Sequence, residues 1–156
     1  MIIKKATFKD YEEVFKLFCE VQDIHNSLYP EIFKKASRKT MSKKMFKQYI
    51  DDKKNAILMA YYNNSPIGYI YITIKAKANS PIHFKPRTVY INHICITEPF
   101  RKKGVAKKLI GQIIKLAKSK NIYSIQLDVW GLNENARNSF SKLGFKTFNE
   151  KMELKV

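Results

Sequence analysis

The residues of this sequence that could do chemistry gather in Arg101-Lys-Lys-Gly-Val-Ala106, which holds three cations and one glycine. An apolar run over residues 89–97 precedes them, and apolar residues at helical spacing follow from Val105 to about Lys120. The first turn of a helix presents free backbone N–H groups and the positive end of the helix dipole. With cations beside it, such a turn binds phosphate. A solvated basic helix start is the alternative that these residues alone leave open.

This turn matches neither of two common phosphate-binding motifs. It lacks the Gly-Lys-Ser/Thr ending of a P-loop, and one glycine does not make a dinucleotide-binding fingerprint. It does resemble the acetyl-CoA-binding motif of the GNAT superfamily of N-acetyltransferases, Arg/Gln-x-x-Gly-x-Gly/Ala, which stands here as Arg101-x-x-Gly104-x-Ala106. The resemblance implies that the phosphates of acetyl-CoA lie over Arg101, Lys102, Lys103, Gly104, Val105 and Ala106, with Lys107 in reach.

A second stretch, from Asn133 to Phe145, resembles the family pattern Asn-x-x-Ala-x-x-x-Tyr-x-x-x-Gly-Phe. The resemblance implies that Asn133, Ala136 and the residue at position 140 lie along the arm of the cofactor. Each residue also has a structural explanation, since Asn133 suits a helix N-cap and Gly144 a helix C-cap. The family's tyrosine, which would protonate the leaving thiolate, is Phe140 here. Water, Ser139, Ser141 or another tyrosine would then supply that proton.

The resemblance also assigns roles to the strand at residues 89–97. In the family, the pantetheine arm pairs like an extra strand with this strand's end, here the backbone of Ile94, Cys95 and Ile96. An amine with a pKa near 10.4 is mostly protonated at pH 7, so a base would assist its attack on a thioester. The family often has a glutamate in this strand, and the matching residue is His93, whose ordinary pKa near 6.5 suits the task. A half-buried histidine bonded to a neighbour is an equal alternative.

His25 and Tyr29 are the candidates for acceptor binding. We expect both in the loop after the first helix, where GNAT proteins often line the acceptor pocket. Packing at a capped helix end explains them more simply. The sequence does not name the acceptor, which could be a small amine, an antibiotic, a peptide N-terminus or a protein lysine.

The periodicity of apolar residues predicts the elements that position these side chains. We expect strands at Ile2–Thr7, Ala56–Tyr62, Ile67–Lys75, 89–97, Tyr123–Trp130 and Phe145–Val156, and helices at Asp10 to about Asp23, Lys39–Asp52, Val105 to about Lys120 and Asn133–Leu143. Asp10 and Glu13 resemble a capping box, and residues 76–87 a loop. The order β-α-α-β-β-β-α-β-α-β predicts an α/β (α+β) mixed sheet, mostly antiparallel with a parallel central pair and helices on both faces. It matches the GNAT fold, with residues 1–156 as a single domain.

The chain is strongly basic. Its net charge of +17 arises from 30 basic and 13 acidic residues, with nine Lys/Arg in residues 34–54 and eight, without any acid, in residues 101–120. Such a field attracts polyanions such as CoA or nucleic acid. A nucleic-acid-binding module is therefore a rival, although aromatics are not interleaved with the lysine runs and no helix-turn-helix or zinc-ligand spacing occurs. A GNAT-like domain that binds acyl-CoA without catalysis is a third possibility, which Phe140 keeps open.

Cysteines and apolar runs bear on the compartment. Cys19 and Cys95 are typical of small core residues in a reduced protein. No apolar run is long enough for a membrane span, and Met1-Ile-Ile-Lys-Lys-Ala has no signal-peptide layout. We therefore expect a cytoplasmic GNAT N-acetyltransferase that uses acetyl-CoA as co-substrate, needs no metal and acts on an amine acceptor. A homodimer is compatible with the sequence, and nucleic acid and membrane are not expected partners.

Overall fold

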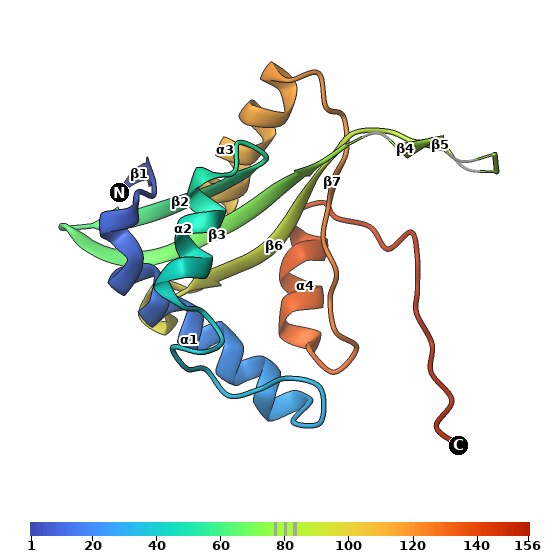
Figure 1. The fold of residues 1–156 in the computed structure, drawn as a ribbon, viewed down its shortest axis with the longest axis horizontal. Helices are drawn as coiled ribbons and strands as arrows, with labels where there is room; N and C mark the ends of the chain where they lie inside the picture. Colours follow the sequence, from blue (N-terminus) through green and yellow to red (C-terminus); the bar gives the residue numbers. More distant parts are fainter. Residues whose placement is uncertain (77, 80, 83) are drawn as a thin grey trace.

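A mixed five-stranded sheet forms the centre of the fold (Figure 1). The computed structural model describes residues 1–76, 78–79, 81–82 and 84–156. The strands of this sheet are β1 (Ile2–Lys5), β2 (Asn55–Tyr62), β3 (Ser65–Lys75), β6 (Thr88–Ile96) and β7 (Ile125–Gln126), in the spatial order β1-β2-β3-β6-β7. Neighbours are antiparallel except β6 and β7, which are parallel, as predicted.

The predicted loop at residues 76–87 contains a small ribbon. There β4 (Ala78–Asn79) pairs antiparallel with β5 (Phe84–Lys85), and the ribbon extends away from the main sheet (Figure 1). Residues 77, 80 and 83 of that range lie outside the described residues. The loop prediction therefore misses a short strand pair, which two residues per strand are too few to indicate from sequence.

Helices cover both faces of the sheet, as the sequence predicts. They are α1 (Tyr11–Leu28), α2 (Lys43–Asp51), α3 (Val105–Ser119) and α4 (Glu134–Lys142), with short 3-10 helices η1 (Phe8–Asp10) and η2 (Glu98–Phe100). α1 and α2 lie on one face of the sheet and α3 lies on the other (Figure 1). α4 lies beside β7, and its residue Phe140 and the adjoining Leu143 pack against the same hydrophobic core as α3. In the described part of the chain, no helix is long and apolar enough to cross a membrane.

Strand alternation divides the core into two apolar layers. In β3, Ile70 and Ile72 are fully buried in the same cluster as Leu109 of α3. Tyr69 points to the opposite face and is buried in the cluster that contains Phe46 of α2. This two-residue period is that of a β-strand, as expected for Ile67–Lys75. Since β6 pairs with β3, the same alternation decides which β6 side chains face α1.

The β2–β3 hairpin turns at Asn63 and Asn64, whose φ angles of 47° and 61° are left-handed, as two-residue hairpin turns require.

Close packing holds β6 against β3. In β3, a Cβ added at Gly68 would lie 2.6 Å from the Cys95 carbonyl oxygen. Glycine is therefore needed at this position for the two strands to approach.

The first helix is longer than predicted and ends at Leu28 rather than near Asp23. No helix-breaking residue occurs before Pro30, so nothing in the chain stops the helix earlier. His25 consequently lies within α1, and Tyr29 is its C-cap residue. The prediction that both occupy the following loop is wrong for His25.

Two other helix starts also differ from the prediction. The prediction of a capping box at Asp10 and Glu13 is wrong. Asp10 Oδ2 instead accepts hydrogen bonds from the N–H (2.6 Å) and the hydroxyl (2.8 Å) of Thr7, which is the N-cap residue of η1. The second helix begins at Lys43 rather than Lys39. Ser42 fixes this start, since its Oγ accepts from the Met45 N–H at 3.2 Å.

Two predicted strands are reduced or missing. Tyr123–Trp130 pairs with β6 only at Ile125 and Gln126, because the two strands then diverge. Phe145–Val156 forms no strand and leaves the body of the protein as an extended segment (Figure 1). No strand of the described residues lies outside β7, so the parallel pair stands at the sheet edge instead of its centre. Alternating apolar residues form a strand only where a neighbour supplies the hydrogen bonds, and this segment has none in the structure.

Candidate active site

β6 and β7 meet at one end and separate at the other. They pair through only two residues each, Val89 and Tyr90 of β6 with Ile125 and Gln126 of β7. On its other side, β6 pairs with β3 as far as Ile96. Among the described residues, the β7-facing edge of residues 91–96 therefore has no strand partner.

A β-bulge marks the place where the strands separate. Ile72 of β3 faces Ile91, but Tyr71 faces His93, so Asn92 is an extra residue in β6. Its side-chain amide donates to Thr73 Oγ1 at 2.8 Å. A bulge bends its strand and re-aims the side chains around it. The bend at Asn92 accounts for the divergence of β6 from β7.

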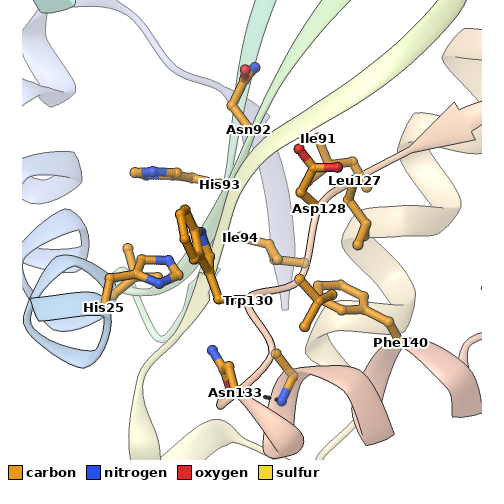
Figure 2. A pocket seen from close by; sticks show the side chains of 13 residues that line it. His25, Ile91, Asn92, His93, Ile94, Leu127, Asp128, Trp130, Asn133 and Phe140 are labelled. Atoms are coloured by element: carbon orange, nitrogen blue, oxygen red, sulfur yellow. Dashed lines mark hydrogen bonds between the residues drawn. The ribbon is translucent and has the colours of Figure 1, made fainter. Parts of the chain in front are cut away.

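A pocket opens between this free edge, α1 and the chain that follows β7 (Figure 2). Its walls comprise Val21, His25, Ile91, Asn92, His93, Ile94, Leu127, Asp128, Val129, Trp130, Asn133, Ala136 and Phe140. It brings together six of the residues that the sequence predicts for the site, namely His25, His93, Ile94, Asn133, Ala136 and Phe140. Sequence reasoning missed Asn92, Asp128 and Trp130. The one signal for Asp128 and Trp130 was that they belong to the predicted strand Tyr123–Trp130, which is expected beside the strand at residues 89–97.

The predicted phosphate turn connects β6 to α3. Gly104 is the N-cap residue of α3 and has a φ of 79°, a left-handed conformation that glycine adopts without strain. The Lys108 N–H donates to the Gly104 carbonyl (3.1 Å), so the N–H groups that precede it in the first turn have no acceptor within the helix. A Cβ at Gly104 would meet no atom within 4 Å. The turn is therefore open to an approaching anion.

The cations of this turn differ in how they are held. Arg101 donates from Nε to the Ile96 carbonyl (3.0 Å), and its Nη2 lies 3.8 Å from a Glu20 carboxylate oxygen. It is thus tied to the end of β6. The side chains of Lys102 and Lys107 are exposed. The side chain of Val105 is buried in the core, so this residue can offer a ligand only its backbone.

The second motif forms one wall of the pocket. Asn133 caps α4, since its Oδ1 accepts from the Ala136 N–H at 3.1 Å. Gly144 closes the helix with a φ of 92°. Phe140 lines the pocket and packs edge-on against Phe145, with ring centroids 5.6 Å apart. The predicted capping roles are confirmed.

His93 is enclosed by rings on the α1 side of β6. Its ring stacks on Phe18 (centroids 5.6 Å apart, 13° between planes), and the His25 ring lies 6.5 Å away. Its Nδ1 is 3.1 Å from the Tyr69 hydroxyl. Burial, helped by the nearby His25 charge, lowers the pKa of His93 to about 4. Burial also raises the pKa of Tyr69 well above its ordinary value. Both groups are therefore uncharged at pH 7.

His25 belongs to an aromatic cluster with Tyr29, Phe33 and Trp130. It stacks on Phe33 at 4.7 Å, and Trp130 lies 4.8 Å from Phe33 and 5.1 Å from Tyr29. The Tyr29 hydroxyl accepts from the Leu132 N–H (2.8 Å) and ties the end of α1 to the chain after β7. The buried Nδ1 of His25 has no hydrogen-bond partner among the described residues. Burial lowers the pKa of His25.

Asp128 supplies a negative charge to the pocket. Its Oδ2 accepts from the Tyr90 hydroxyl at 2.6 Å, and burial together with this carboxylate raises the pKa of Tyr90 to about 12. The described residues that line the pocket include no other acid, and no lysine or arginine. The pocket thus differs in charge from the strongly basic chain around it.

Comparison with known proteins shows the family of this chain. A model of the acetyltransferase (GNAT) family matches residues 18–145. The chain therefore belongs to the GNAT acetyltransferase family, which makes it an acyltransferase by class. In the described part of the chain, no three His, Cys, Asp or Glu side chains gather as a metal site would require.

Three solved structures illustrate the likeness. A mutant of the BH1408 protein from Bacillus halodurans is 28% identical, with a TM-score of 0.94 over 100% of this chain and 99% of that one. A predicted acetyltransferase from Clostridium acetobutylicum, solved with acetyl-CoA, is 21% identical (TM-score 0.75; 99% and 95% of the chains). An aminoglycoside 6'-N-acetyltransferase from Acinetobacter haemolyticus is 18% identical (TM-score 0.78; 100% and 98%). The last two show the shared fold.

Proposed function

We propose that this protein transfers the acetyl group of acetyl-CoA to a primary amine. The observation that carries the proposal is the free edge of β6 at residues 91–96, which borders the pocket and ends at the open turn before α3. An extended arm with amide groups can add to such an edge as a strand. The edge, with the phosphate-competent turn at Arg101–Ala106 beyond it, suits a ligand with phosphates at one end and a reactive thioester at the other.

Residues of β6 and α4 would guide the arm of the co-substrate. Ile94, Cys95 and Ile96 offer their backbone, because the Cys95 side chain is buried and the two isoleucines pack against the core. Ala136 and Phe140 face the pocket from α4. Lys102, Lys103 and Lys107 add positive charge around the turn. The turn's backbone N–H groups and these cations together would hold the phosphates.

Acetyl-CoA supplies a thioester carbonyl that an amine nitrogen can attack. The C–N bond forms, the C–S bond breaks, the nitrogen gives up one proton and the leaving thiolate takes one. We assign the first proton to His93, which lines the pocket uncharged. In this role Nε2 accepts the proton and Nδ1–H donates to the Tyr69 oxygen. With a pKa of about 4, the ring is a weak base that passes the proton on quickly.

The proton for the thiolate is assigned to water. Phe140 has no hydroxyl, and the described residues of the pocket wall include no tyrosine or serine. The Ser139 hydroxyl donates to the Asn135 carbonyl (2.7 Å) and is exposed, away from the pocket. We therefore assign the proton to solvent, because no described residue of the pocket wall has a hydroxyl group.

The acceptor amine would enter on the α1 side of the pocket. There the rings of His25 and Trp130 line the pocket, with Phe33 packed against both, and Asp128 would give an ammonium group a counter-charge. The unpartnered Nδ1 of His25 could bond to a polar group of the acceptor. Tyr29 would act by holding Trp130 in place rather than by touching the acceptor.

A melting experiment tests co-substrate binding. Acetyl-CoA at a hundredfold excess over its dissociation constant should stabilise the fold by about 2.7 kcal/mol. Gly104→Asp should abolish the shift, since it places a side chain and a negative charge in the open space above the turn. Gly111→Asp, two turns further along α3 and also in open space, is the matched control and should keep the shift. No shift of the wild-type protein at millimolar acetyl-CoA would reject the proposal.

A turnover assay distinguishes an enzyme from a domain that only binds acetyl-CoA. The second function is favoured by Phe140, which replaces the tyrosine expected to protonate the thiolate. Release of free CoA from acetyl-CoA should depend on an amine, and a panel of amines with one cationic group on an aromatic or apolar body is the first choice for this pocket. If acetyl-CoA stabilises the fold but no primary amine in a broad panel releases CoA, the protein is a binding domain.

A further inference from the structure

One face of α3 carries a row of positive charge. We call Lys107, Lys108, Lys115 and Lys118 the lysine row, and all four side chains are exposed. With 3.6 residues per turn, they lie within about 100° of the helix circumference. The buried side chains of α3, which include Leu109 and Ile113, are on the opposite side. α3 itself covers the face of the sheet away from α1 and α2 (Figure 1). The lysine row therefore faces solvent, on the side of the molecule away from the α1 wall of the pocket.

No acid balances this charge within the described part of the chain. α3 contains no aspartate or glutamate, and none of the ion pairs among the described residues involves the lysine row. Lys115 and Lys118 are also remote from the phosphate turn, since they lie about three and four turns beyond Gly104, roughly 16 Å and 21 Å along the helix axis. Phosphates over the turn could not pair with them. Because lysines on one helix face repel one another, a different anion is needed to offset this charge.

Gly111 stands in the middle of the lysine row. It lies inside α3, between Lys108 and Lys115 on the same face. A Cβ there would meet nothing within 4 Å, so no contact in the described structure requires a glycine. Glycine weakens a helix interior relative to alanine, and what it provides is a stretch of backbone that another chain can approach closely. Ile114, at the side of the row, is 41% exposed. This face thus combines four cations, accessible backbone and one apolar side chain.

We propose that this face of α3 docks an acidic helix of a partner protein. The interaxial distance of two packed helices depends on the side chains at their contact, so a helix that crosses α3 at Gly111 can approach closely. Carboxylates on either side of the crossing would then reach the lysine row, and an apolar residue of the partner would pack on Ile114. Each exposed lysine–carboxylate pair contributes little, so the docking is reversible and sensitive to salt. The proposal does not depend on the catalytic one.

The composition of this face favours a protein over a nucleic acid as the partner. Surfaces that bind single-stranded nucleic acids combine cations with aromatic side chains on which bases stack, and α3 contains no aromatic residue. The row also lacks arginine, whose planar guanidinium suits phosphate. Gly111 and Ile114 add nothing to the binding of a phosphate backbone, whereas both fit the close packing and apolar contact of a protein interface.

Binding of two synthetic peptides to the full chain tests this inference. The first is a labelled helical peptide with glutamates along one face and a leucine among them, and the second has the same composition with the glutamates spread around the helix. At physiological salt the second should bind at least about tenfold more weakly, because only the first can present its carboxylates to the row together. Lys115→Gln with Lys118→Gln should weaken the first peptide by about tenfold. Both side chains are exposed, so the fold should survive.

Two further variants separate the lysine row from charge in general. Lys39→Gln with Lys44→Gln removes the same charge from the other basic region and is the matched control. It should change the affinity for the first peptide by about twofold or less, since salt screens distant charges. Gly111→Leu changes no charge and places a side chain at the crossing point. It should weaken the first peptide as well, while leucine maintains the helix.

Four results would overturn the proposal. They are the absence of binding at about 1 mM of the first peptide, equal binding of the two peptides, equal effects of the two lysine pairs, and unchanged binding by the Gly111→Leu variant. A random-sequence duplex serves as the competing probe. If at physiological salt it binds more tightly than the first peptide, and Lys115→Gln with Lys118→Gln weakens it, the lysine row binds nucleic acid instead.

Discussion

The ring of His93 lies among Phe18, His25 and Tyr69, and this enclosure links chemistry to stability. Its pKa is about 4 in the folded protein and near 6.5 in the unfolded chain. Between these values the unfolded state binds a proton that the folded state excludes, so stability falls as the pH falls. From pH 7 to pH 5 this single ring should remove about 2 kcal/mol from the free energy of unfolding.

Denaturant titrations at several pH values check this expectation. His93→Gln removes one titrating ring and should reduce the decline between pH 7 and pH 5, leaving the smaller part that His25 contributes because burial lowers its pKa too. Below that window the carboxylates contribute too, since hydrogen bonds from Thr7 and Tyr61 lower the pKa of Asp10 although its burial opposes them. A variant with the wild-type slope from pH 7 to pH 5 would show that His93 titrates normally in the folded protein.

The catalytic assignment of His93 makes a separate prediction. His93→Ala should lower kcat at pH 7 by roughly 10²-fold, the lower end for a general base because the ring is weakly basic, while KM for acetyl-CoA stays nearly constant. His25→Ala should instead raise KM for the amine, since His25 lies in the acceptor wall. Phe140→Tyr should leave acetyl-CoA binding unchanged. An active His93→Ala enzyme with an unchanged pH profile would make His93 a packing residue.

The tautomer of His93 tests the same assignment without kinetics. A base at Nε2 requires the proton of the neutral ring on Nδ1, donating to Tyr69. Nitrogen-15 shifts of the ring should report this tautomer at pH 7, and Tyr69→Phe should disturb it. A proton on Nε2 would contradict the base role, because Tyr69 then donates to Nδ1 and the ring can only donate toward the pocket.

At this scale the sequence predicted residue types better than their environments. His93, Asn133 and Phe140 were found through the resemblance to the GNAT family, and all three line one pocket. The pKa of His93 could not be predicted, because Phe18 and Tyr69 reach it from distant parts of the chain. Asp128 joins the pocket only because β6 and β7 diverge, which no local pattern reports.

At the scale of elements, the β3–β6 contact aligns the free edge with the phosphate turn. An alanine Cβ at Gly68 would lie 2.6 Å from the Cys95 carbonyl oxygen and 2.7 Å from Ile96 Cδ1. Gly68→Ala must therefore shift the strands apart and should destabilise the fold by about 1–3 kcal/mol. Acetyl-CoA affinity should fall as well, because Ile96 ends the edge along which the arm would lie.

Gly111→Ala is the matched control for Gly68→Ala. Gly111 lies inside α3, and a Cβ there meets nothing within 4 Å. The substitution should stabilise the protein by roughly 0.5–1 kcal/mol, since alanine favours the helix interior. Thermal melts with and without acetyl-CoA measure both variants. Equal stability changes in the two would show that Gly68 is not a close-approach position.

Elements with a strong local period were predicted well, and those that depend on partners were not. The helix from Val105 and the turn before it could be predicted from the helical spacing of apolar residues, from Gly104 and from Pro99, which ends the preceding strand. Residues 145–156 alternate as a strand should, yet they have no strand neighbour in the structure. Periodicity states that a segment can form a strand, whereas pairing depends on what lies beside it.

At the scale of the whole molecule, the net charge of +17 must be separated from the specific site. Duplex DNA or RNA would bind through counterion release, so neutralising 6–10 phosphates should cost about 10³–10⁵ in affinity between 50 and 200 mM salt. Acetyl-CoA carries few charges and would also bind through the β6 edge and the pocket walls, so its affinity should fall roughly tenfold or less over the same range.

Titrations of acetyl-CoA and of a random-sequence duplex, each at low and at physiological salt, make the comparison. An enzyme should keep its acetyl-CoA affinity at physiological salt while the duplex dissociates. Lys39→Gln with Lys44→Gln removes two exposed cations from the basic region at residues 34–54 and should weaken the duplex alone. If the duplex binds tightly at physiological salt and acetyl-CoA does not, the charge serves a nucleic acid and the acetyltransferase proposal fails.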